Sequence, residues 1–190
     1  MNEVEELREQ IESWVKPGFR SRPDVVQYAI EYAEDDGVLS EEQATQLVDE
    51  VWARRLQEQQ AWPESTDADR LAAAFAELDA AGVVARMNFT CCQNCGHAEI
   101  DDERPEDRES SAYVFFHQQD ADGLAEEPAA LYLAYGVFDA DKNPWEARVV
   151  DAGHQITKTL RAHDLPVTWS GTSAQRIQVG PLDWRRRLPG

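Results

Sequence analysis

The spacing of apolar residues predicts three helices in the first third of the chain. Over residues 3–15 apolar side chains recur every three or four positions, which is the period of an amphipathic helix. A second helix is expected from about residue 23 to residue 33, because a proline such as Pro23 suits the first turn of a helix. A third begins at Ser40, where Gln43 completes the pattern of a capping box. These helices predict an N-terminal helical unit over residues 1–63.

The pattern changes after this unit. Residues 57–66, QEQQAWPEST, are polar, contain Pro63 and interrupt the helical period, so a domain boundary is expected there. A fourth helix follows from about Asp67 to Gly82. Over residues 83–89 the apolar period falls from 3.6 to 2, which predicts a strand. Residues 97–111 are rich in charged side chains and are expected to form a loop or a ragged helix at the surface.

Two further strands are predicted at residues 113–117, YVFFH, and 131–138, LYLAYGVF. Their nearly continuous apolarity indicates central positions in a sheet. The polar connection between them favours antiparallel pairing.

A long helix is then expected to begin at Asn143-Pro144 and to end near His163, followed by a terminal hairpin of residues 165–169 and 175–179. The element order predicts an α+β fold, in which the N-terminal helical unit precedes a mainly antiparallel sheet with helices packed on one face. Residues 64–180 would form this second domain, which carries the cysteine cluster, and residues 181–190 a C-terminal tail.

The charge of the chain excludes some classes of partner. Thirty-seven acidic and 18 basic side chains leave a formal net charge of -19, which repels phosphate backbones and anionic lipid. Neither a nucleic acid nor a membrane is therefore expected as a partner, and the short basic cluster Arg185 to Arg187 is typical of a solvated tail. A protein partner is compatible with this surface, and Trp62 and Trp184 are the expected surface anchors.

The location expected for the chain is the cytoplasm. No apolar segment approaches the roughly 18 residues of a membrane span, and the sequence MNEVEELREQ lacks the profile of a signal peptide. Three cysteines, two of them adjacent, do not make a paired disulfide framework. In a reducing compartment they are expected to be free thiols, metal ligands or redox-active groups.

The candidate chemistry lies in residues 82–97, GVVARMNFTCCQNCGH. Cys92 and Cys95 have the spacing of a metal knuckle, with Cys91 just before them and His97 just after, and zinc is the ion that such ligands prefer. The glycine after Cys95 would let the backbone reverse. If the strand continued through Cys91 and Cys92, their side chains would diverge. A tetrahedral site would then need a further ligand, for which the candidates are His117, His154 and His163.

Three other hypotheses fit the same residues. Cys92 and Cys95 could form a redox pair if a helix began at this point, since its amide dipoles would lower the pKa of Cys92. One thiol could act as a nucleophile with His117 as base and Asp120 as orienter, both in the segment FHQQD. Alternatively, Cys91 and Cys95 could be small buried residues of a tight turn without any chemistry.

The segments VVARMNFTCCQNCGHAEI, YVFFHQQD, LYLAYGVF and LPVTWSG, in this order, resemble a bacterial family that is known as an uncharacterised domain of unknown function. The likeness covers about Asp67 to Val179, and CCQNCG and FHQQD are its most specific parts. The resemblance implies a cytosolic bacterial protein and a compact domain. It implies no catalytic residues.

Together these observations predict a binding or interaction module rather than an enzyme. Its site would be built from the three cysteines with His97 and His117, and zinc is the one cofactor that the residues indicate. The competing prediction is a thiol redox protein or a thiol-dependent enzyme that uses Cys92 and Cys95.

Overall fold

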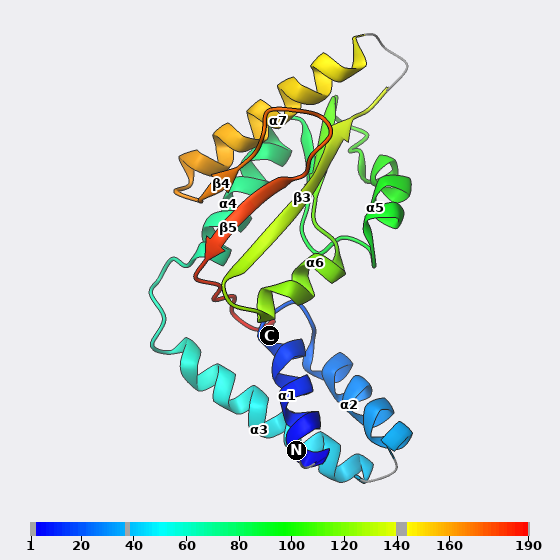
Figure 1. Cartoon of the computed structure of the whole chain (residues 1–190), viewed down its shortest axis with the longest axis vertical. Coiled ribbons are helices and arrows are strands. Elements are labelled where there is room, and N and C mark those ends of the chain that lie inside the picture. The colour runs from blue at the N-terminus through cyan, green and yellow to red at the C-terminus, as the bar shows by residue number, and fades with distance from the viewer. Residues whose placement is uncertain (1–2, 37–38, 140–143, 190) are drawn as a thin grey trace. The chain divides into compact units, whose positions relative to one another are not determined.

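The computed structural model describes residues 3–36, 39–139 and 144–189 (Figure 1). The chain divides into two compact units, one of residues Met1–Thr66 and Trp184–Gly190 and one of residues Asp67–Asp183. Among the described residues, no helix has the length and apolarity that crossing a bilayer requires.

The first unit is built from helices α1 (Glu3–Val15), α2 (Arg22–Asp36) and α3 (Glu41–Gln59). The predicted capping box is confirmed, because the Gln43 N–H donates to Ser40 Oγ and the Ser40 N–H donates to Gln43 Oε1. The apolar faces of the three helices meet in one core that contains Ile11, Val25 and Val48, each of which is fully buried. The helices are therefore held by burial of their apolar stripes, as their period predicts.

The end of the chain belongs to this helical unit. Trp184 is only 5% exposed, its indole N–H donates to the carbonyl of Pro17 at 3.1 Å, and its ring stacks on Phe19. The expectation that Trp184 is a surface anchor is therefore wrong. Its neighbours in sequence are polar, but the side chain packs against residues near the start of the chain, which a local pattern does not reveal. Trp62 is half-buried beneath the guanidinium of Arg55.

The second unit is an α+β domain with a five-stranded mixed sheet. The strands are β1 (Val83–Arg86), β2 (Ala112–Phe115), β3 (Ala129–Val137), β4 (Val167–Thr168) and β5 (Ile177–Leu182), in the order β1-β2-β3-β5-β4. Only β1 and β2 are parallel. The predicted antiparallel pairing of the two central strands and the predicted terminal hairpin are both confirmed.

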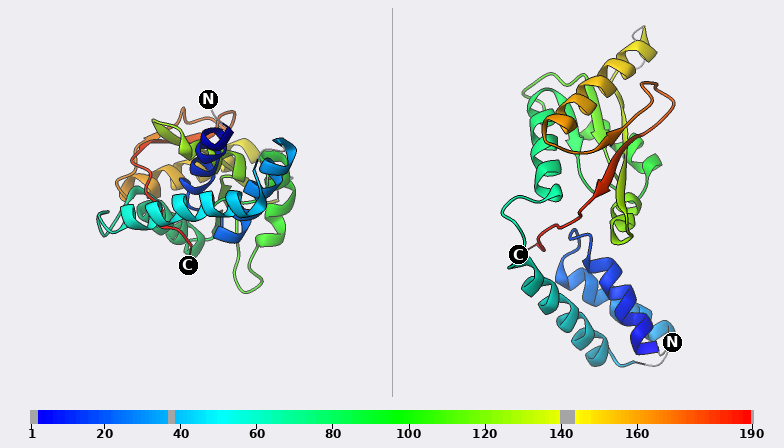
Figure 2. Two further views of the ribbon diagram at one scale, coloured as in Figure 1. Left: turned by 90° about the horizontal axis from the view of Figure 1, so that it is seen from below. Right: turned by 60° about the vertical axis from the view of Figure 1, so that its left-hand side comes forward.

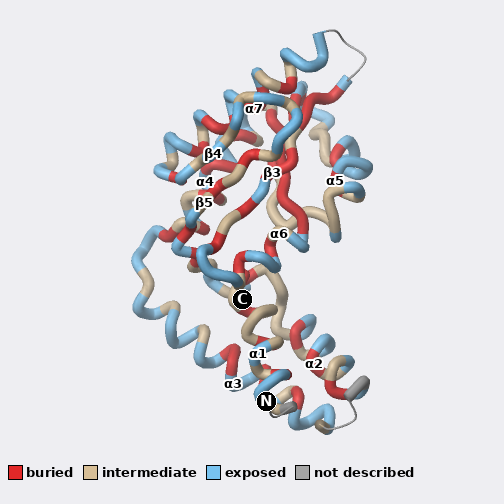
Figure 3. Tube along the Cα trace, in the orientation of Figure 1, coloured by how far each residue is buried: buried red, intermediate tan, exposed pale blue. Residues whose placement is uncertain are grey.

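Helices lie against both faces of this sheet (Figures 1 and 2). Helices α4 (Asp67–Ala80) and α7 (Trp145–Ala162) cover one face, where Phe75 of α4 contacts Phe116. The short helix α5 (Gln93–Glu99) and the 3-10 helix η1 (Ile100–Glu103) lie against the other face. The buried residues concentrate along the strands and on the helix sides that face them (Figure 3).

Two short helical segments were not predicted as such. Helix α5 begins inside the cysteine cluster, and α6 (Gln118–Asp122), with the 3-10 helix η2 (Gly123–Ala125), occupies the polar connection between β2 and β3. Each is too short to show a helical period in the sequence. Of the predicted start of the long helix, Asn143 lies outside the described residues.

We expect Trp184→Ala to lower the free energy of unfolding of the helical unit by about 3–5 kcal/mol, because it removes a buried aromatic side chain and leaves a cavity. Urea unfolding followed by far-UV circular dichroism measures this change. The matched control is Trp145→Ala, since Trp145 is 43% exposed, and it should cost less than about 1 kcal/mol. Equal losses for the two variants would contradict the assignment of Trp184 to the core.

Candidate metal-binding site and adjoining cavity

The chain leaves the extended conformation just before the cysteines. After β1 ends, Asn88 and Thr90 adopt positive φ angles of 52° and 57°, so the backbone turns twice within three residues. Backbone hydrogen bonds hold this turn, since the Phe89 N–H donates to the Phe116 carbonyl and the Gln118 N–H to the Thr90 carbonyl. The predicted strand therefore stops at Arg86, and the cysteines do not continue it.

This turn brings the three thiols together. The sulfur atoms of Cys91, Cys92 and Cys95 all lie within 4.8 Å of one another, and Cys91 Sγ is 3.5 Å from Cys95 Sγ. The divergence expected for Cys91 and Cys92 does not arise, because it required an extended chain. Cys91 is exposed and the other two are half-buried, so the three are not inert core residues. They form a cluster, here called the thiol cluster, that could hold a metal ion such as zinc.

The thiols of the cluster differ in acidity. The backbone N–H of Cys95, assisted by the thiols of Cys95 and Cys91, lowers the pKa of Cys92. The neighbouring thiols of Cys91 and Cys92 raise the pKa of Cys95 to about 12. Without a cation, one thiolate at Cys92 is thus favoured over a second at Cys95, because adjacent negative charges repel.

Gly96 allows helix α5 to approach the sheet. Its backbone is helical, so the glycine does not serve to reverse the chain as the sequence suggested. A Cβ at this position would lie 2.3 Å from Cε2 of Phe115, which is far inside van der Waals contact. The absence of a side chain therefore lets α5 pack directly on the Phe115 ring.

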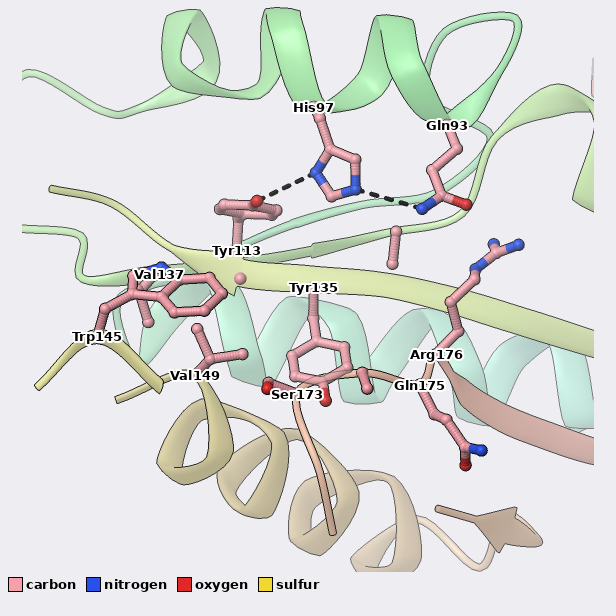
Figure 4. Close-up of a pocket in the computed structure, with 13 residues that line it drawn as sticks. Gln93, His97, Tyr113, Tyr135, Val137, Trp145, Val149, Ser173, Gln175 and Arg176 are labelled. Carbon is pink, nitrogen blue, oxygen red and sulfur yellow. Dashed lines mark hydrogen bonds between the residues drawn. The ribbon is translucent and has the colours of Figure 1, made fainter. Parts of the chain in front are cut away.

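His97 extends from α5 toward Tyr113 and Gln93 (Figure 4). Its Nδ1 is 3.0 Å from the Tyr113 hydroxyl, its Nε2 is 3.5 Å from Gln93 Nε2, and its ring contacts Phe115 edge-on. Burial, reinforced by the positive charge of Arg176, lowers the pKa of His97. Residues two apart on a helix differ by roughly 200° in direction, so His97 and Cys95 do not converge.

His117 and Asp120 contact each other, but no thiol of the described chain is among the partners of His117. His117 is the N-cap of α6, where its Nδ1 accepts from the Asp120 N–H while the Asp120 carboxylate accepts from the His117 N–H. Burial lowers the pKa of His117 against the opposing effect of Asp120. The carboxylate also accepts from Arg176. These groups form a structural cap, and Arg176, which holds it in place, was not identified from the sequence.

The two remaining histidines are engaged elsewhere. His154 packs edge-on against Trp169, and His163 Nε2 is 2.9 Å from the Glu77 carboxylate. Within the described residues, no histidine or carboxylate joins the thiol cluster.

A cavity of about 360 Å³ lies between α5 and the C-terminal half of β3 (Figure 4). Gln93, His97 and Tyr113 line one wall, and Trp145 and Val149 line another. The sequence pattern did not identify this cavity, because its tyrosines belong to apolar strands whose period assigned them to the core.

The chain belongs to the family described as Domain of unknown function (DUF6891), which matches residues 1–188. This match confirms the resemblance to an uncharacterised domain family and extends it over the N-terminal helices. Neither a curated protein nor a solved structure matches the chain.

We expect Gly96→Ala to destabilise the second unit by about 1–3 kcal/mol, since the added methyl group must displace either α5 or the Phe115 ring. The control is Gly123→Ala, because a Cβ there meets no atom within 4 Å and the backbone is helical. It should change the free energy of unfolding by less than about 0.5 kcal/mol. Urea unfolding compares the two, and a harmless Gly96→Ala would contradict the close approach of α5.

We also expect the metal-free thiols to be alkylated in a fixed order as pH rises. The thiolate is the reactive form, so the lowered pKa of Cys92 makes it react before Cys95, whose pKa of about 12 keeps it protonated at neutral pH. Iodoacetamide labelling of chelator-treated protein, followed by peptide mass spectrometry across a pH series, measures the order. Faster labelling of Cys95 would be inconsistent with this arrangement.

Proposed function

We propose that this chain is a metal-binding module in which Cys91, Cys92 and Cys95 supply three thiolates to one Zn²⁺ ion. The observation that carries the proposal is the convergence of the three sulfur atoms to within 4.8 Å of one another. Thiolates at this spacing are the ligands that zinc takes in proteins.

The sulfur spacing suits a zinc ion with little rearrangement. A tetrahedral site with Zn–S distances near 2.3 Å separates its sulfur atoms by about 3.8 Å. The 3.5 Å between Cys91 Sγ and Cys95 Sγ is close to this value, whereas a disulfide would require about 2.05 Å. Side-chain adjustments that change the sulfur separations by at most about 1 Å would thus form the metal site, since no two sulfur atoms are more than 4.8 Å apart.

The electrostatics of the thiol cluster also favour a cation. Ionising all three thiols places three negative charges side by side, and the raised pKa of Cys95 expresses the cost of doing so without an ion. A divalent cation offsets this repulsion and displaces the protons. The net charge of -19 further raises the concentration of cations near the surface.

A site with three thiolates leaves one coordination position for a ligand from outside the described chain. Because Cys91 is exposed, a water molecule or a donor from a partner protein can reach the thiol cluster from solvent and would take this position. The module would then bind through its metal as well as through its surface. The thiols must stay reduced for this purpose, which suits a cytoplasmic protein.

We expect the protein to hold about one zinc ion per chain, as measured by elemental mass spectrometry after gel filtration. Each of Cys91→Ser, Cys92→Ser and Cys95→Ser should weaken zinc binding by more than about 100-fold, since even the loss of an outer-shell partner costs 10–100-fold. Competition with a chromogenic chelator measures the affinities.

The matched control is His97→Ala, which should retain zinc because His97 bonds Tyr113 instead of facing the thiols. Loss of zinc in His97→Ala would contradict the three-thiolate site. Absence of zinc, with all three thiols freely titratable, would overturn the proposal.

A redox function is the second candidate, and the 3.5 Å distance between Cys91 Sγ and Cys95 Sγ favours it. This pair differs from the Cys92 and Cys95 pair that the spacing suggested. Peptide mapping after mild oxidation distinguishes the two functions, since a reversible Cys91–Cys95 disulfide in zinc-free protein would support redox chemistry.

A further inference from the structure

The central strand of the sheet is paired along different lengths on its two sides. On one side, β2 pairs with residues 134–137 of β3. On the other side, β5 pairs with residues between Ala129 and Leu133, and it begins only at Ile177, opposite Leu133. Within the described chain, residues 134–137 therefore have no strand beside them on the β5 side.

The cavity lies at this unpaired edge. Ala134, Tyr135, Gly136 and Val137 all line it. Successive side chains of a strand point to opposite faces of the sheet, so a cavity that four successive residues line must run along the edge of the strand. Figure 4 shows the same arrangement, with His97 and Tyr113 on one side of β3 and Tyr135 and Val149 on the other.

The hydrogen bonds of the neighbouring strands indicate which backbone groups face the cavity. Phe138 donates its N–H to the Ser111 carbonyl, on the β2 side. Backbone groups alternate in direction along a strand, so Gly136 and Ala134 also face β2. The N–H and C=O groups of Tyr135 and Val137 then point to the cavity, and they repeat every two residues, about 6.8 Å.

We propose that this cavity binds an extended peptide segment of a partner protein, which adds to the sheet as a strand beside residues 134–137 of β3. Tyr135 and Val137 together offer two N–H donors and two C=O acceptors, and these groups are spaced as a neighbouring strand requires. That spacing is the pattern by which an exposed sheet edge recognises a peptide main chain.

The residues that line the walls of the cavity determine which peptide side chains can bind there. One wall is polar and uncharged, with Gln93, His97 and Tyr113. The opposite wall is mixed, with the apolar Trp145 and Val149 beside Tyr135 and Ser173. Alternate residues of an added strand would face these two walls. The segment should therefore alternate small polar residues with apolar ones.

Charge also restricts the peptide. Among the described residues, no carboxylate lines the cavity, although the chain carries a net charge of -19. Within the same part of the chain, Arg176 is the one permanently charged residue in the lining, and it is paired with Asp120. Both conditions favour an uncharged segment, because a charged peptide side chain would lose its hydration without gaining an opposite charge.

The far wall of the cavity does not close the edge. Tyr135 donates its hydroxyl to the Thr172 carbonyl, and Ser173 Oγ donates to the Glu146 carboxylate. The first bond holds the segment before β5 to a side chain of β3 and the second holds it to α7. Neither is a ladder bond, since the pairing of β3 with β5 begins at Leu133 and Ile177.

Nuclear magnetic resonance of the ¹⁵N-labelled 190-residue chain tests the proposal. The probes are capped pentapeptides Ac-Thr-X-Thr-X-Thr-NH₂ in which X is Val, Leu or Phe. At least one should shift the amide resonances of Tyr135 and Val137 in a saturable manner. In the free protein, these two amides should exchange with solvent at least 10-fold faster than those of Ala134 and Gly136. Protected Tyr135 and Val137 amides, or no saturable shift with any probe, would overturn the proposal.

Two controls separate main-chain recognition from apolar adhesion. Val137→Pro removes an N–H that faces the cavity and should bind at least 10-fold more weakly than Val137→Ala, which shortens the same side chain but retains the N–H. If Val137→Pro does not fold, N-methylation of alternate amides in the peptide makes the same test on the unaltered protein. Equal binding of the methylated and unmethylated peptides would refute strand addition.

Discussion

The contact between helix α5 and Phe115 is the one on which both candidate sites depend. Gly96 has no side chain, and for this reason the seven-residue helix lies directly on a ring that is fully buried in the sheet. A helix this short has little stability of its own, so its position is set by tertiary packing. Once α5 is in place, the thiols converge at its beginning, and His97 lines the cavity.

The unequal strand lengths of the sheet are the second constraint. Strand β3 is nine residues long and is shared between β2 and β5, each of which pairs with only part of it. A sheet with such an offset leaves main-chain N–H and C=O groups without a strand partner. Proteins usually cover such an edge or place charged side chains on it, which prevents association with other chains. Here the open edge lies inside a cavity with walls from α5 and α7, so the surrounding side chains restrict what can reach it.

Much of the fold could be predicted from local patterns. The capping box at Ser40 and the antiparallel pairing of β2 with β3 depend on residues close in sequence or on long apolar runs, and both are present. The burial of Trp184, in contrast, depends on a contact with Pro17 near the other end of the chain. The polar residues beside Trp184 in the sequence do not indicate this contact.

At the candidate site, the possible ligands could be identified without the structure: three thiols within five residues, followed by a glycine and a histidine. The sequence also identified His117 and Asp120 as neighbours, which they are. The convergence of all three thiols and the separate position of His97 could not be predicted, because both depend on tertiary contacts. The positive φ angles at Asn88 and Thr90 and the packing of Gly96 on Phe115 depend on β2 and the residues after it, which lie about 20 positions beyond the cysteines.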